Sequence, residues 1–114
     1  MAEIRQYRVT EYAVSYFAGI SPHVSDTEAV VASIRLYAAD GQHRGTVHFQ
    51  PDGVAKLKEA AYNEQTGEIT LYYSASMVYT VIDILRNEEP ISIRYVSPRA
   101  AGIFTDKEPI GEGE

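Results

Sequence analysis

Residues 33–49 read SIRLYAADGQHRGTVHF, and this stretch specifies a β-hairpin in two independent ways. The Asp40-Gly41 pair at its centre favours a two-residue type I′ turn, because both central residues of that turn need φ > 0 and these residue types tolerate it. Such a turn pairs apolar residues across the two strands: Ala32 with Phe49, Ile34 with Val47, and Leu36 with Gly45. A register shifted by one residue would mix the two faces, so the turn and the alternation support each other.

The second face of this hairpin collects polar and aromatic side chains: Arg35, Tyr37, Arg44, Thr46 and His48. Arginine donors beside aromatic rings can hold a small anionic ligand or single-stranded nucleic acid on a sheet. The same residues can also simply pack across neighbouring strands as a solvated surface. We take this set as the candidate binding face and rank the solvated surface above the binding function.

Motifs for catalysis, metal binding and nucleotide binding are absent from the sequence. There is no cysteine, which excludes disulfides, thiolate catalysis and cysteine zinc sites. The histidines lack metal-ligand spacing, and the predicted register places His43 and His48 on opposite faces of the hairpin. Gly41, Gly45 and Gly53 fit no phosphate-binding loop and are interpreted as turn glycines. We therefore predict no catalytic residue, no metal and no cofactor, and we lean against an enzyme.

Strands are also predicted on both sides of the hairpin. The first spans residues 7–17 and is followed by a loop at residues 19–26, which contains glycine, proline and small polar residues. Residues 54–62 fit either a helix or a strand; we prefer a strand, at residues 56–62, because the loop at residues 63–67 leads into an alternating strand at residues 68–74. That second hairpin would pair Leu57 with Tyr73 and Ala61 with Ile69.

The clearest helix runs from about Ser76 to Asn87. Its apolar residues follow helical spacing: Val78, Val81, Ile82 and Leu85. Ser74 or Ser76 can cap its first turn, and Pro90 prevents its continuation. Residues 91–96 form a further strand, placed after the helix as in a βαβ unit. Beyond it, Ile103 and Phe104 are expected to dock or to add a short strand.

These elements predict an α+β fold. It consists of a mainly antiparallel sheet of about five to six strands, with the amphipathic helix at about residues 76–87 packed on one face. We expect the helix to cover the apolar side chains of the strands: Ile34, Leu36, Val47, Phe49, Ile69 and Leu71. A chain of 114 residues suits one domain, which we place at residues 1–105, with an acidic and mobile tail at residues 106–114.

Composition limits the partners that we expect. The net charge of −6 opposes the nucleic-acid backbone. The chain contains no apolar run long enough for a membrane span and no signal peptide at its start, so we expect a cytoplasmic protein.

The predicted functions follow from the sheet and its aromatic residues. Nine tyrosines and the need to protect sheet edges favour self-association, as a homodimer or with another protein partner. We therefore rank a self-associating, non-catalytic interaction module first. A binder of an anionic ligand or single-stranded nucleic acid is second, and a small enzyme without a recognisable motif is third.

Overall fold

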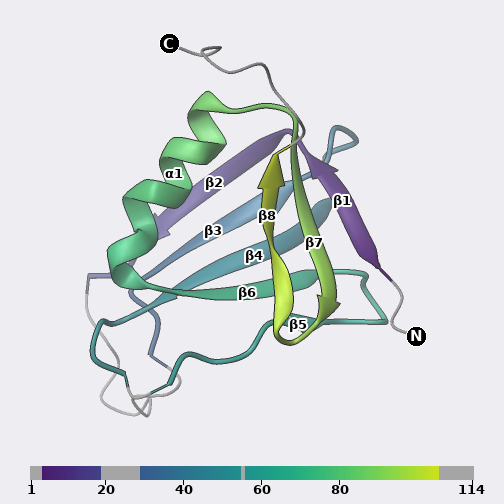
Figure 1. The fold of residues 1–114 in the computed structure, drawn as a ribbon. Helices are drawn as coiled ribbons and strands as arrows, with labels where there is room; N and C mark the ends of the chain where they lie inside the picture. Colours follow the sequence, from purple (N-terminus) through teal and green to yellow (C-terminus); the bar gives the residue numbers. More distant parts are fainter. Residues whose placement is uncertain (1–3, 19–28, 55, 106–114) are drawn as a thin grey trace.

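The computed structural model describes residues 4–18, 29–54 and 56–105 (Figure 1). In these residues the strands are β1 (Arg5–Val9), β2 (Glu11–Tyr16), β3 (Ala32–Tyr37), β4 (His43–Gln50), β5 (Ala61–Tyr62), β6 (Ile69–Ser74), β7 (Ile91–Ser97) and β8 (Ala100–Thr105). The helical segments are the 3₁₀ turn η1 (Ala75–Met77) and the α-helix α1 (Val78–Asn87). The α+β class with mainly antiparallel pairing is confirmed.

The strands form two sheets, although the sequence predicted one. The larger sheet has the order β2-β3-β4-β6-β5 and the smaller one has the order β1-β7-β8. In Figure 1, β7 and β8 cross in front of β3, β4 and β6, so the sheets are two layers. All neighbouring strands are antiparallel except β4 and β6, which are parallel.

The two sheets are joined along one side by β1 and β2, which follow each other in the chain with Thr10 between them. β1 pairs with β7 in the smaller sheet, whereas β2 pairs with β3 in the larger one. The Thr10 N–H donates a hydrogen bond to the Tyr37 carbonyl at 2.8 Å, which holds the junction to the larger sheet. The single strand predicted over residues 7–17 is therefore wrong, because the chain bends at Thr10 and changes sheets.

The β3–β4 hairpin has the predicted register, with Ile34 opposite Val47 and Leu36 opposite Gly45. Its turn differs from the predicted type I′ turn, because only Gly41 has a positive φ, of 83°. The Gly41 N–H donates to the Ala38 carbonyl at 2.9 Å, which is a type I turn followed by a left-handed glycine. That loop is one residue longer than predicted, and a bulge beside Leu36 restores the register.

The core lies on the inner face of the larger sheet, beneath both α1 and the smaller sheet. Its buried residues are Val9, Ala32, Ile34, Leu36, Val47, Phe49, Ile69, Leu71, Val78, Val81, Ile91 and Ile93. Ile82 and Leu85 of α1 pack at its margin. The predicted contact between the helix and the apolar face of the strands is confirmed, and β1 and β7 add a second cover.

Gly45 lies where the two layers meet. It is a buried residue of β4, so its interpretation as a turn glycine is wrong. A Cβ at this position would lie 2.5 Å from the Ile93 Cδ1 atom and 2.8 Å from the Ile69 carbonyl oxygen. Glycine therefore allows the Ile93 side chain of β7 to rest directly on the β4 backbone.

The strand predicted at residues 56–62 is reduced to the two residues of β5. Ala61 pairs with Thr70, and Tyr62 pairs with Ile69, one residue away from the predicted register. This shift packs the Tyr62 ring against the core and exposes Ala61, which buries more apolar surface. Before β5, the Lys58 N–H donates to the side chain of Gln50 at 2.9 Å instead of joining a strand ladder.

The helical segment ends at Asn87 as predicted, but it starts differently. No side-chain cap from Ser74 or Met77 is present, so the predicted serine cap is wrong. Asp52 in the turn after β4 supplies the acceptor instead, receiving the Ser76 N–H at 3.2 Å and the Ser74 hydroxyl at 2.8 Å. An acceptor that is distant in sequence therefore satisfies the free donors at this end.

The last two strands complete the smaller sheet. The predicted βαβ unit is wrong, because β6 and β7 lie in different sheets. The prediction that Ile103 and Phe104 add a strand is confirmed by β8. The loop predicted at residues 19–26 and the tail predicted at residues 106–114 lie outside the described residues.

Candidate functional site

The outer face of the larger sheet, turned away from the core, carries four of the five residues predicted as a binding face: Arg35, Tyr37, Thr46 and His48. Arg44 is not among them. Its guanidinium carbon lies 4.6 Å from the centre of the Tyr7 ring, beside the smaller sheet. The bulge in β4 is the physical reason, because it inserts an extra residue and so turns Arg44 to the other side.

His43 occupies the place on the outer face that was predicted for Arg44. Its ring centre lies 5.5 Å from that of Tyr37, and its Nε2 atom lies 3.0 Å from Thr46 Oγ1. Its Nδ1 atom lies 2.8 Å from Glu68 Oε1. His43 and His48 therefore share this face, and the prediction that they lie on opposite faces is wrong.

His48 forms a second polar contact group on the outer face. Its Nδ1 atom lies 2.6 Å from Ser33 Oγ, and its ring centre lies 5.4 Å from that of Tyr72. Burial, together with the charge of Lys58, lowers the pKa of His48. The polar atoms of this face thus bond largely to one another, which is the arrangement of a packed polar sheet surface. Binding of an anion or nucleic acid at this face stays a prediction.

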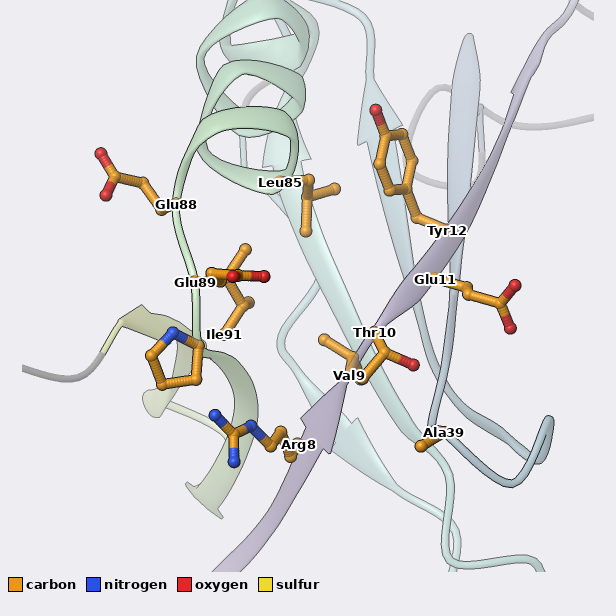
Figure 2. Close-up of a pocket in the computed structure, with 11 residues that line it drawn as sticks. Arg8, Val9, Thr10, Glu11, Tyr12, Ala39, Leu85, Glu88, Glu89 and Ile91 are labelled. Atoms are coloured by element: carbon orange, nitrogen blue, oxygen red, sulfur yellow. The ribbon is translucent and has the colours of Figure 1, made fainter. Parts of the chain in front are cut away.

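A cleft of about 540 Å³ lies at another place, where β1 passes into β2 (Figure 2). It is lined by residues 8–12, by Ala39 of the β3–β4 loop, by Leu85 of α1, and by residues 88–91, which lead from α1 into β7. Its volume is in the range of small-molecule sites, which is about 300–1,000 Å³. The cleft therefore lies between the bend that joins the sheets and the end of the helix.

The floor of the cleft is apolar. Val9 and Ile91 are buried, with 7% and 4% of their surfaces exposed, and they stand opposite each other in the β1–β7 pair. In Figure 2, Leu85 points down from α1 toward these two side chains. The β1–β7 ladder and the helix therefore hold the floor in place from two directions.

The rim of the cleft carries opposite charges. Arg8 belongs to β1 and Glu89 precedes β7, and both line the cleft (Figure 2). Glu11 and Glu88 also line the cleft, but they point outward in that view. Within residues 4–18, 29–54 and 56–105, neither Arg8 nor Glu89 belongs to an ion pair. Both charges are therefore available to a ligand.

The C-terminal end of α1 adds partial negative charge on the Glu89 side of the cleft. The Glu88 N–H donates to the Ile84 carbonyl at 3.0 Å, which closes the last turn beside the cleft. The carbonyls that follow lack partners within the helix, and they form the negative end of its dipole. A cationic group is therefore favoured beside Glu89, and an anionic group beside Arg8.

No sequence signal indicated this cleft. Arg8 and Glu89 lie near opposite ends of the chain, in segments without a motif, and only the pairing of β1 with β7 brings them together. Comparison with protein-family models, with curated proteins and with solved structures finds no match. Among the described residues, no three or more His, Cys, Asp or Glu side chains gather to hold a metal ion. No helix in that part of the chain is long and apolar enough to cross a membrane.

Proposed function

We propose that this protein is a non-catalytic binding module for a small molecule with an apolar body and ionised groups of both signs. The observation that carries the proposal is the cleft, with its apolar floor at Val9 and Ile91 and its opposite charges at Arg8 and Glu89. Ligand sites commonly combine an apolar wall with a few polar groups that fix orientation. An amino acid with an apolar side chain is the simplest compound of this class.

The expected pose follows from the charges. The carboxylate of such a ligand meets Arg8, its ammonium group meets Glu89 beside the end of α1, and its side chain covers Val9 and Ile91. Burying a leucine-sized side chain contributes about 2–3 kcal/mol. Each exposed ion pair adds up to about 1 kcal/mol. Association costs at least about 4 kcal/mol in lost translational and rotational freedom, so these terms predict weak binding, with a dissociation constant in the millimolar range or above.

Amide chemical shifts recorded during titration with leucine test the proposal. Two matched compounds lack one charge each: 3-methylbutylamine and 4-methylpentanoate. We expect saturable shifts at residues 8–12 and 88–91, with leucine binding several-fold more tightly than either compound. Shifts centred elsewhere, or equal binding of all three compounds, would contradict the assignment.

Variants make this test specific to the rim. Arg8→Gln and Glu89→Gln should each weaken leucine binding several-fold, because each removes one charge partner. Glu88→Gln is the control for Glu89→Gln, since its side chain points outward. Arg35→Gln on the outer face is the control for Arg8→Gln. Equal binding by the rim variants and their controls would overturn the proposed pose.

Self-association is the second candidate, and the composition of β8 favours it. β8 is an edge strand of the smaller sheet and contains no charged residue, whereas the other edge strand, β1, carries Arg5 and Arg8. Uncharged edge strands are templates for pairing with another chain. Sedimentation velocity over a concentration series should show a dimer that Ala100→Lys abolishes. A monomer at every concentration would refute this candidate.

A further inference from the structure

A cluster of two arginines and three tyrosines lies at the seam between the two sheets. Its members are Arg5 and Tyr7 of β1, Arg44 of β4, Tyr62 of β5 and Tyr95 of β7, and we call it the arginine–tyrosine cluster. All five side chains are partly exposed. The cluster is separate from the cleft, because it lies at the opposite end of the β1–β7 pair.

Each arginine of the cluster covers a tyrosine ring. The Arg44 guanidinium carbon lies 4.6 Å from the centre of the Tyr7 ring, and that of Arg5 lies 5.0 Å from the Tyr62 ring. Tyr62 in turn stacks on Tyr95, with their ring centres 5.8 Å apart. A guanidinium that covers a ring by its face keeps its N–H groups directed sideways, where they can bind an oxyanion through two parallel hydrogen bonds.

The hydroxyl groups of Tyr7 and Tyr62 together have one proton that their mutual hydrogen bond does not use. The Tyr7 and Tyr62 hydroxyl oxygens lie 3.4 Å apart, and either can donate to the other. A phenol has one proton, so this single bond uses one of two protons and leaves the second for an acceptor outside the pair. In the part of the chain that the structure describes, neither hydroxyl has a further hydrogen bond. This proton faces an acceptor from outside the chain, which is water or a ligand, because both tyrosines are partly exposed.

The charges near this donor indicate which acceptor fits. The hydrogen bond with Tyr62 and burial raise the pKa of Tyr7, so its hydroxyl keeps its proton, although the charges of Arg44 and Arg5 oppose this rise. Among the described residues Arg44 forms no ion pair, although the chain as a whole is acidic. The guanidinium of Arg44 and the second hydroxyl proton are donors only, and Arg44 also supplies positive charge. An anion with several acceptor oxygens complements this arrangement.

We infer that the arginine–tyrosine cluster binds a phosphate group. A tetrahedral dianion can accept from the Arg44 guanidinium through two oxygens and from the hydroxyl through a third, whereas a planar carboxylate has only two oxygens for these donors. The free ion and a phosphate ester on a larger metabolite share this chemistry. Glucose 6-phosphate, compared with inorganic phosphate, distinguishes the two sources.

Titration with inorganic phosphate at constant ionic strength, followed by amide chemical shifts, tests the inference. We expect saturable shifts at residues 5–7, 44 and 62, and weaker binding of acetate by at least tenfold. Glucose 6-phosphate binding more tightly than phosphate would identify an ester as the source, and the reverse would identify the free ion. Absence of saturable shifts, or equal binding of acetate, would overturn the inference.

Substitutions separate a ligand site from a structural cluster. Arg44→Gln should weaken phosphate binding at least tenfold, while Arg35→Gln, which changes an exposed arginine of the same sheet, should leave it unchanged. Arg44→Lys keeps the charge but loses the paired N–H donors of the guanidinium, so we expect the phosphate affinity to fall several-fold. This variant replaces Arg44→Gln if Arg44→Gln does not fold. Tyr7→Phe keeps the ring and should weaken binding a few-fold. Variants that lower stability without changing the phosphate affinity would show that the cluster only packs.

Discussion

Gly45→Ala tests the contact between the two sheets directly. The added Cβ would lie 2.5 Å from the Ile93 Cδ1 atom and 2.8 Å from the Ile69 carbonyl oxygen. Ile93 Cδ1 ends a flexible side chain, but it is fully buried and has little room to move. The Ile69 carbonyl belongs to the adjacent parallel strand and cannot shift without disturbing the ladder. We therefore expect the variant to be less stable than the wild-type protein.

The magnitude follows from two opposing terms. Inserting a methyl group into a well-packed core costs about 1–3 kcal/mol. Alanine in a strand is favoured over glycine by about 0.5–1 kcal/mol, because glycine loses more backbone entropy on folding. The net loss in the free energy of unfolding is thus about 0–2.5 kcal/mol, with a central value near 1 kcal/mol. In a domain of this size, each kcal/mol lowers the melting temperature by about 4–8 °C.

A double-mutant cycle with Ile93→Val identifies the cause of the loss. Ile93→Val removes the Cδ1 atom and should itself cost about 0.5–1.5 kcal/mol. In the double variant the new methyl group occupies the vacated space. We therefore expect the stability loss of the double variant to be smaller than the sum of the two single losses by at least about 0.5 kcal/mol. Urea denaturation followed by circular dichroism measures all four proteins. Additive losses would refute the packing argument.

Three further substitutions test single contacts. Asp52→Ala should cost about 1 kcal/mol, because it removes the acceptor of the Ser76 N–H; an unchanged urea midpoint would contradict this role. Burial raises the pKa of Tyr73 and the backbone of Ile103 opposes this rise, so Tyr73→Phe should alter hydrogen exchange at Ile103 and cost about 1 kcal/mol; unaltered exchange would show that this interaction contributes little. The folded-state pKa of His48 lies below its unfolded value of about 6.5. Its stabilising contribution is therefore complete above that pH and is lost as the pH falls through the folded pKa, so His48→Asn should flatten the stability profile there. An NMR titration of His48 at or above the ordinary histidine pKa would rule this out.

The hairpin shows how far the alternation of the sequence can be trusted. Its register could be predicted, because a slip by one residue would expose Ile34 and Val47 to water. The turn type could not be predicted. The loop that ends at Gly41 is one residue longer than expected, and the bulge beside Leu36 compensates for this residue, so the pairing beyond the bulge is the same for both turn types. Their combined effect appears at Arg44, which the bulge moves off the predicted binding face, and at His43, which takes its place there.

The division into two sheets could not be predicted from local pattern. Residues 7–17 read as one strand, and nothing in their alternation shows that the chain changes partners at Thr10. The cleft depends on this bend and on the pairing of β1 with β7, so its charged rim was missed. The register of Tyr62 was missed for a related reason. Its ring stacks on Tyr95 of β7 in the other sheet, a contact that the local pattern of the second hairpin does not show.

The β1–β7 pair connects both proposed binding sites with the core. Val9 and Ile91 face each other at one end and form the floor of the cleft, whereas Arg5 and Tyr95 face each other at the other end, in the arginine–tyrosine cluster. Ile93 lies midway along β7 and rests on Gly45. A change at Gly45 therefore displaces the strand that carries parts of both sites, while Arg8→Gln and Arg44→Gln each affect one site. The close contact at glycine thus sets the position of two surfaces that share no residue.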